Sequence, residues 1–269
     1  MDDLDIREKT GQRPDIREKI GQKLDEIEQA ENVRILYAVE SGSRSWGFAS
    51  PDSDYDVRFI YVRTLEDYLR LDQKRDVIEW QLDEVLDING WDLQKVLRQF
   101  HKSNATVFEW SNSPIVYRTS EAWDAIYQAA KGYFSPKSVL YHYYGTAKST
   151  YCQFLQGEQV RYKKYFYALR PLLSCCYIRE HGCPPPIAFD ELMKTELPQE
   201  LRAKIVHLLE LKKGMGEKEQ RPQLPVIRNF ILAQLDEQKA YAEALEAEPP
   251  KGWDVLNAVF CETVKKSVL

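Results

Sequence analysis

The sequence predicts an α+β fold in which a small mixed-sheet domain is followed by an all-helical domain. Apolar runs of strand length, rich in β-forming residues, lie at 33–40 and 54–62 and again between 77 and 88. After Ala130 the apolar residues recur at helical spacing instead. The chain has 269 residues, more than one hydrophobic core usually supports. We therefore expect two domains, at 1–130 and 131–269, with a ligand cleft between them.

Composition narrows the class of protein. Hydrophobic residues make up 43% of the chain and aromatic residues 12%, which is enough to build cores. The net charge of −5 argues against indiscriminate binding to nucleic acid. No run of about 18 apolar residues is present, so we expect no membrane span. The first residues are acidic and lack the apolar segment of a secretory signal.

The five cysteines indicate a reducing compartment, because their number is odd and their spacing matches no disulfide framework. We therefore expect a cytoplasmic protein. Cys175, Cys176, His181 and Cys183 raise the alternative of a metal cluster. Because Cys175 and Cys176 are neighbours within an apolar helical pattern, buried structural thiols are the favoured interpretation.

The N-terminal region contains a short duplication, DIREKTGQ at 5–12 and DIREKIGQ at 15–22. One duplication of this length does not indicate a repeat architecture. Pro14 suits the start of a helix, and apolar residues follow at helical spacing in 15–30. We expect this helix to pack on the sheet.

A strand, a turn and a second strand carry the candidate chemistry. Gly42-Ser43 ends the run at 33–40, a helical turn is expected at 44–48, and the strand at 54–62 follows. Asp54 and Asp56 are two residues apart, so a strand directs both carboxylates to one face. A divalent cation relieves their repulsion, and Mg²⁺ takes one or two carboxylates together with substrate phosphates. The backbone N–H groups at Gly42-Ser43 favour a phosphate nearby.

The segment after these strands predicts further elements of the first domain. A short helix is expected at 65–71, and 77–81 with 84–88 form one interrupted strand or a hairpin. Asp87 lies on the face opposite Leu86 and Ile88. Asp92 precedes a helical pattern and is interpreted as its N-cap. A helical turn at 104–110 and a strand at 115–117 follow.

Helices are expected at 138–156, 163–180, 200–213, 227–246 and 253–268. Residues 131–182 carry eight basic and two acidic residues and nine of the sixteen tyrosines. Basic groups interleaved with aromatic rings suit a polyanion whose bases can stack. The alternative is a helical core with a solvated basic face.

Several motifs together resemble a known family. Gly42-Ser43 followed by Ser53-Asp54-Tyr55-Asp56 resembles the signature of the DNA polymerase β nucleotidyltransferase superfamily. More narrowly, the chain resembles the predicted nucleotidyltransferases of RNA repair operons, the RNA-ligase-associated polymerase family, over roughly 33–190. The motifs are GSRSWG at 42–47, SDYDVR at 53–58, GWDL at 90–93, EW at 109–110 with SP at 113–114, and KKYFYALRP at 163–171.

The resemblance implies an enzyme of the EC 2.7.7 type with a polymerase-β-like catalytic domain. Such an enzyme transfers a nucleoside monophosphate from an NTP to a hydroxyl acceptor. It implies Mg²⁺ or Mn²⁺, as two ions held by Asp54, Asp56 and a third carboxylate on a later strand. Asp87 is the expected third carboxylate, and Asp83 is the alternative.

Other residues receive roles in the same interpretation. Gly42 and Ser43 bind the outer phosphates, and Arg44 adds positive charge there unless it is an exposed helix-start arginine. Arg58 alternates onto the face of Asp54 and Asp56 and is expected to support their carboxylates.

The helical domain is expected to close on the triphosphate. Lys148, Lys163 and Lys164 are the candidates, although Lys163 and Lys164 point in different directions and at most one reaches it. Tyr167 is a candidate to stack on the base, with core packing as the alternative.

The acceptor is left open between three interpretations. The resemblance and the basic, tyrosine-rich helices favour an RNA 3′ end, such as that of a tRNA. The second interpretation is adenylyl transfer to a small molecule or a protein side chain. The third is a non-catalytic module that binds nucleotide or RNA, although two unused like charges at Asp54 and Asp56 would be costly to retain. The preferred NTP and the oligomeric state are not predicted.

Overall fold

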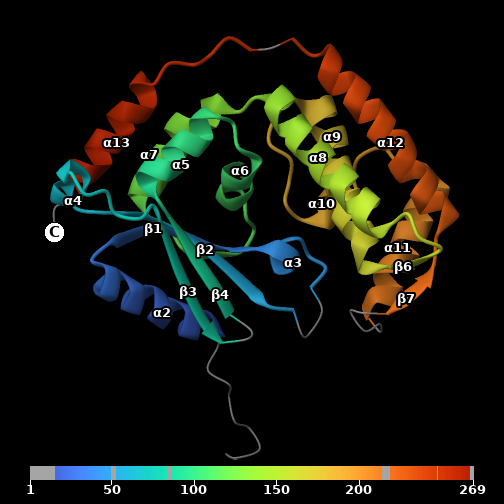
Figure 1. Ribbon diagram of the computed structural model, residues 1–269, viewed down its shortest axis with the longest axis horizontal. Coiled ribbons are helices and arrows are strands. Elements are labelled where there is room, and N and C mark those ends of the chain that lie inside the picture. The colour runs from blue at the N-terminus through green and yellow to red at the C-terminus, as the bar shows by residue number, and fades with distance from the viewer. Residues whose placement is uncertain (1–15, 50–52, 84–85, 214–218, 247, 267–269) are drawn as a thin grey trace, which may run out of the picture.

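The computed structural model describes residues 16–49, 53–83, 86–213, 219–246 and 248–266. Its five main strands are β1 (Arg34–Ser41), β2 (Tyr55–Val62), β3 (Val77–Asp83), β4 (Leu86–Asp92) and β5 (Val116–Arg118). They form one mixed sheet in the order β3-β4-β2-β1-β5. The predicted α+β architecture is confirmed: the sheet and its helices come first in the chain, and a helical array follows (Figure 1).

The pairing of the strands brings the candidate acids together. β2 pairs antiparallel with β1 and parallel with β4. In this register Asp56 lies opposite Ser41 on one side and Asp87 on the other. β3 and β4 are antiparallel neighbours, so of the two forms predicted for 77–88 the hairpin is confirmed. The first copy of the N-terminal duplication lies outside the described residues.

Helices cover both faces of the sheet. The helix α2 (Ile16–Glu31) buries Ile20, Leu24 and Ile27 on one face. The opposite face is covered by α5 (Leu93–His101), α6 (Ala105–Ser111) and α7 (Glu121–Ala130). The sequence pattern predicts no element at 118–130, yet α7 forms there, with Ser120 accepting a hydrogen bond from the backbone N–H of Trp123. Two short helices lie in the connections between strands: α3 (Gly42–Ser45) between β1 and β2, and α4 (Leu65–Leu69) between β2 and β3.

The second half of the chain is mostly helical, as predicted. It contains the short 3₁₀ helix η1 (Lys131–Tyr133), α8 (Pro136–Phe154), α9 (Lys163–His181), α10 (Phe189–Leu192), α11 (Gln199–Lys213), α12 (Pro225–Ala244) and α13 (Asp254–Lys266). The expectation of helices alone is wrong in one respect, because β6 (Gln159–Arg161) and β7 (Gln220–Pro222) pair as a small antiparallel sheet. Each strand has three residues and one contains proline, so neither shows the alternation that identifies a strand.

The last helix, α13, returns to the sheet domain. It packs against α7 and α5 (Figure 1), and the ring centroid of Phe260 lies 5.1 Å from that of Tyr68. A hydrogen bond holds the connection between α12 and α13: Lys251 Nζ donates to the carbonyl oxygen of Gly132 at 2.7 Å. The ring of Trp253 stacks on His101, with 3.6 Å between centroids. In the part of the chain that the structure describes, no helix has the length and apolarity to cross a membrane.

The N-cap role predicted for Asp92 is confirmed, and it has a consequence for stability. Asp92 is buried and accepts hydrogen bonds from the Gln94 N–H at 2.7 Å and the Tyr68 hydroxyl at 3.0 Å. Burial raises the pKa of Asp92 to about 6, above the value expected in the unfolded chain. Between these two pKa values the folded state binds more protons, so the free energy of unfolding falls as the pH rises from about 4 to about 6.

We expect Asp92→Asn to remove this contribution, because asparagine is also a good N-cap and does not ionise. Urea unfolding of both proteins at about pH 4 and at about pH 6 measures the effect. From about pH 4 to about pH 6 the wild type should lose roughly 2 kcal/mol of unfolding free energy relative to Asp92→Asn. A difference that stays constant with pH would contradict the expectation.

Candidate active site

The Gly-Ser turn packs directly against Asp56. Gly42 has a φ of +67°, and a Cβ built at this position would lie 2.2 Å from Asp56 Oδ2. Glycine is therefore required both by the backbone conformation and by the close approach of the carboxylate. Ser45 Oγ donates to the Gly42 carbonyl oxygen at 2.9 Å, which closes the single turn of α3.

The buried side chain of Glu40 holds the backbone of Asp56. Glu40 is 1% exposed, and its Oε1 accepts the Asp56 N–H at 2.9 Å while Oε2 accepts the Tyr117 hydroxyl. Burial raises the pKa of Glu40, and the two hydrogen bonds oppose that shift. The sequence predicts no role for Glu40. The only signal is a carboxylate at the end of an apolar strand.

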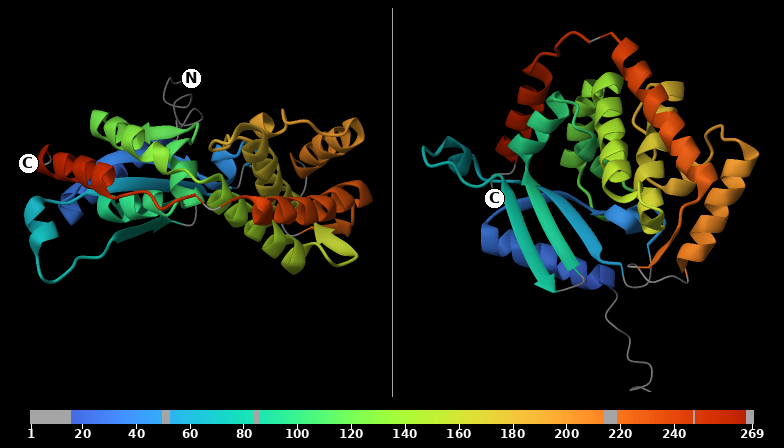
Figure 2. Two further views of the ribbon diagram at one scale, coloured as in Figure 1. Left: turned by 90° about the horizontal axis from the view of Figure 1, so that it is seen from above. Right: turned by 45° about the vertical axis from the view of Figure 1, so that its right-hand side comes forward.

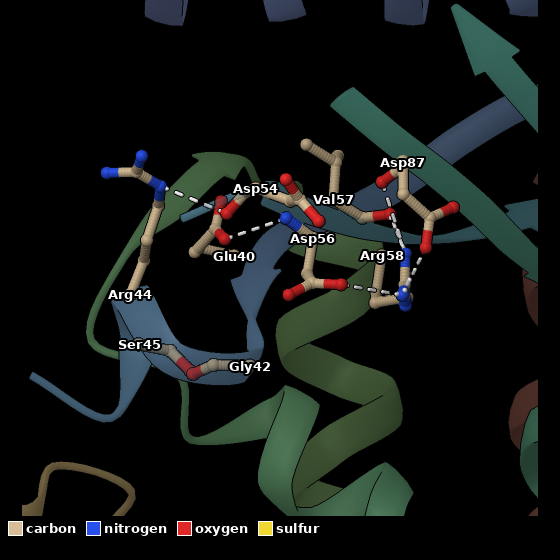
Figure 3. Close-up of polar contacts among 9 residues, drawn as sticks. All are labelled: Glu40, Gly42, Arg44, Ser45, Asp54, Asp56, Val57, Arg58 and Asp87. Carbon is tan, nitrogen blue, oxygen red and sulfur yellow. Dashed lines mark hydrogen bonds and ion pairs between the residues drawn. The ribbon is translucent and has the colours of Figure 1, made fainter. Parts of the chain in front are cut away.

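Arg58 lies between Asp56 and Asp87 (Figure 3). Its guanidinium contacts Asp56 Oδ1 at 3.1 Å and Asp87 Oδ2 at 2.8 Å. Burial raises the pKa of Asp56, Arg58 opposes this shift, and the charges of Asp87 and Asp54 add to it. The contact with Asp56 agrees with the supporting position expected for Arg58.

A pocket of about 300 Å³ lies where the two halves of the chain meet. Its lining residues are Gly42, Ser43, Trp46, Ser53, Asp54, Asp56, Lys163 and Tyr167. The first six come from the β1–β2 region, and the last two are one turn apart on α9. The pocket therefore combines both aspartates with the Gly-Ser turn and a cationic side chain from the helical half.

Four of the predicted site residues lie outside this pocket lining: Asp87, Lys148, Lys164 and Arg44. Asp87 is more than half exposed and pairs with Arg58. Lys164 Nζ lies 4.0 Å from the centroid of the Phe154 ring, and Lys148 Nζ lies 5.7 Å from that of Tyr144. Of the neighbouring lysines, only Lys163 reaches the pocket. Asp83 ends β3, but its side chain lies outside the described residues.

Arg44 holds the loop that carries Asp54. Its Nε donates to the Asp54 carbonyl oxygen at 3.1 Å (Figure 3), and a terminal nitrogen donates to the carbonyl oxygen of Ser53. Its guanidinium also stacks 3.6 Å from the centroid of the Tyr55 ring. These contacts direct Arg44 to the backbone before β2 and not to the pocket.

A buried ion pair joins the two halves beside the pocket. Arg170 on α9 donates to Glu109 on α6 at 2.9 Å, with the two side chains 6% and 18% exposed. Tyr143 on α8 also donates to Glu109, at 2.8 Å. The Arg170 guanidinium lies 4.5 Å from the ring centroid of Trp46, a pocket residue. Glu109 and Arg170 lie in two of the family motifs, but the sequence predicts no role for either.

More than half of the tyrosines in the basic stretch at 131–182 are buried. Five of its tyrosines are buried in the cores: Tyr133, Tyr143, Tyr151, Tyr162 and Tyr165. Arg170 is used in the ion pair with Glu109, and Arg179 pairs with Glu237. The helical core, which was the alternative interpretation, accounts for most of these rings.

The described residues show chemistry suited to one divalent cation in the pocket. Asp54 and Asp56 supply the hard oxygen ligands that Mg²⁺ prefers, beside an open space large enough for phosphates. No group of three or more acid, histidine or cysteine side chains arranged for a metal occurs among the described residues. The cluster considered at Cys175 to Cys183 is therefore not assembled, and Cys175 is buried.

We expect Gly42→Ala to lower any activity of this pocket by roughly 100-fold, because the new Cβ displaces the Asp56 carboxylate. Gly47→Ala is the matched control, since Gly47 also has a positive φ of +81° but a Cβ there meets nothing within 4 Å. Both variants should lose stability from backbone strain, and only Gly42→Ala should lose turnover. Equal turnover in the two variants would contradict this assignment.

Comparison with known proteins places both halves of the chain in one family. The model of the RNA repair pathway DNA polymerase beta family matches residues 16–262. The chain is 44% identical over 247 residues to the uncharacterized protein YcgL of Bacillus subtilis (strain 168), an alignment that covers 90% of this chain and 94% of that protein. A crystal structure of a nucleotidyltransferase-like protein from Exiguobacterium sibiricum 255-15 has a TM-score of 0.30 and 11% sequence identity, with 91% and 87% of the two chains covered.

Proposed function

The chain belongs to the RNA repair pathway DNA polymerase beta family, and on that premise we propose that it transfers a nucleoside monophosphate from an NTP to the 3′ hydroxyl of an RNA. One observation carries the proposal. The pocket brings Asp54 and Asp56 together with the Gly42-Ser43 turn and Lys163 from the helical half. Paired carboxylates beside a phosphate-sized space suit phosphoryl transfer.

Five residues of the pocket lining receive roles in this proposal. Asp54 and Asp56 would hold Mg²⁺ or Mn²⁺, which supplies charge neutralisation to the triphosphate and to the leaving pyrophosphate. Ser43 and Lys163 would bind the outer phosphates from opposite walls. Since α3 has only four residues, this binding depends on individual side chains and N–H groups more than on a helix dipole. Tyr167 would limit the position of the nucleoside.

Asp87 is the candidate ligand for a second ion. It lies opposite Asp56 in the parallel pairing of β2 with β4, but its carboxylate is held by Arg58 at 2.8 Å. For Asp87 and Asp56 to share an ion, this ion pair must open. Until then Arg58 would bridge the two carboxylates and occupy the space that an ion between them would need.

The test is incubation of the protein with each labelled NTP, Mg²⁺ or Mn²⁺, and RNA that ends in either a 3′ hydroxyl or a blocked 3′ end. Label on the free-ended RNA alone supports the proposal. Label on the protein itself would instead favour side-chain adenylylation, and no label anywhere would contradict nucleotidyl transfer. The Asp54→Asn/Asp56→Asn protein is the negative control for each arm.

A further inference from the structure

A second cavity, of about 410 Å³, lies at the opposite end of the sheet from the pocket. It is lined by Arg63, which follows β2, by α4 and the segment between α4 and β3, and by α5. Figures 1 and 2 show α4 at the edge of the molecule, away from α3. Asp56 and Arg63 are separated by seven residues of strand, so the cavity lies about 23 Å from the pocket.

Positive charge predominates in this cavity. Five cationic side chains line it, Arg63, Arg70, Lys74, Arg75 and Arg98, against the three acids Asp67, Asp76 and Asp92. Lys74 is paired with Asp67 at 2.6 Å, and Arg70 with Asp72 outside the lining. Within the described part of the chain, the exposed side chains of Arg75 and Arg98 form no ion pair. Two guanidinium groups therefore remain available to an anion.

Two buried polar atoms on the wall of the cavity have no hydrogen-bond partner among the described residues. One is the donor Arg63 Nε, on a side chain that is 7% exposed, and the other is the acceptor Asp67 Oδ2. Leaving such atoms unpaired costs free energy, and a native site usually satisfies them with a ligand or water. A ligand that complements both must accept hydrogen bonds and also donate one.

The sugar–phosphate backbone of RNA has both properties, since its phosphate oxygens accept and its 2′ hydroxyl donates. We propose that this cavity binds the backbone of the acceptor RNA while its 3′ end lies in the pocket. The proposal rests on the proposed function, because it takes RNA as the acceptor. The distance of about 23 Å corresponds to roughly seven base pairs of a helix, so the contact engages the body of the RNA and not its reacting end.

The test compares RNA binding by two variants that each lose two positive charges. Arg75→Gln with Arg98→Gln removes the unpaired guanidinium groups of the cavity. Lys131→Gln with Lys204→Gln is the matched control, since both lysines are exposed and lie away from the cavity. Fluorescence anisotropy is measured over a range of salt concentrations with a hairpin RNA whose stem has about twelve base pairs, and with a trinucleotide too short to reach the cavity from the pocket.

The cavity variant should bind the hairpin roughly tenfold more weakly than the wild type, with a shallower dependence on salt, and should bind the trinucleotide equally well. The control variant should match the wild type with both RNAs. Equal hairpin affinity in the cavity variant and the wild type, or an equal loss in the control variant, would overturn the cavity assignment. If the cavity assignment fails in this way but the wild type still transfers label to RNA, the proposed function stands. A wild type that neither binds nor labels RNA would contradict both the cavity assignment and the proposed function.

Discussion

Asp56→Asn should lower nucleotidyl transfer by roughly a thousandfold or more, a loss of about 4 kcal/mol of transition-state stabilisation. The substitution keeps the size of the side chain and removes the charge that would hold the cation beside Asp54. The fold should persist, because burial already disfavours the charged form of Asp56 and Arg58 retains Asp87 as a partner. Single-turnover transfer from labelled NTP and urea unfolding measure the two effects.

Asp236→Asn is the charge-matched control, since Asp236 is exposed on α12 and forms no ion pair within the described residues. Its turnover should equal that of the wild type. The same assay applied to Asp87→Asn tests the second ion. A loss of turnover comparable to that of Asp56→Asn would support Asp87 as a metal ligand. Turnover of Asp56→Asn within a few-fold of the wild type would remove the pocket from the mechanism.

The sequence predicts most of this site because its signals are local. The turn at Gly42-Ser43 and the spacing of Asp54 and Asp56 depend on neighbouring residues. The predicted strand at 54–62 begins one residue later, at Tyr55, so Asp56 lies in β2 and Asp54 lies in the loop that Arg44 holds. The hairpin at 77–88 and the N-cap at Asp92 are local in the same sense. The sequence predicts that at most one of Lys163 and Lys164 reaches the triphosphate, but it does not predict which. The direction of each side chain depends on how α9 packs against the rest of the chain.

The parts that the sequence does not predict depend on contacts between distant segments. Glu40 meets Tyr117 across 77 positions of the chain, and Arg170 meets Glu109 across 61. A charged residue in an apolar run does not identify its partner, so neither contact follows from spacing. The tyrosines of 131–182 show the converse: their number is typical of nucleic-acid binding, yet five of the nine are buried in the core.

We expect Arg170→Met to lower the free energy of unfolding by about 3–5 kcal/mol, because it leaves the Glu109 carboxylate largely buried without its cation. It also removes the guanidinium that lies 4.5 Å from the ring centroid of Trp46. Arg170 shares one face of α9 with Lys163 and Tyr167, at spacings of seven and three residues. Loss of this anchor should therefore raise the KM for NTP by roughly tenfold.

Arg179→Met is the matched control on the same helix, since the ion pair of Arg179 with Glu237 has both side chains more than 40% exposed. An exposed pair contributes little, so this variant should lose less than about 1 kcal/mol and keep its KM. Urea unfolding and initial-rate kinetics, measured on both variants, distinguish a buried anchor from a surface contact. Equal stability losses in the two variants would contradict the buried-pair interpretation.

The double variant Glu109→Leu/Arg170→Met separates stability from positioning. Replacing a buried ion pair with apolar side chains is often neutral or stabilising, so the double variant should be more stable than Arg170→Met alone. Its KM should nevertheless stay raised, because leucine and methionine do not restore the cation beside Trp46, and Arg170→Lys should give an intermediate KM. A double variant with wild-type stability and wild-type KM would contradict the positioning role. The ion pair would then only hold the two halves together, and the position of Trp46 and α9 at the pocket would not depend on the Arg170 cation.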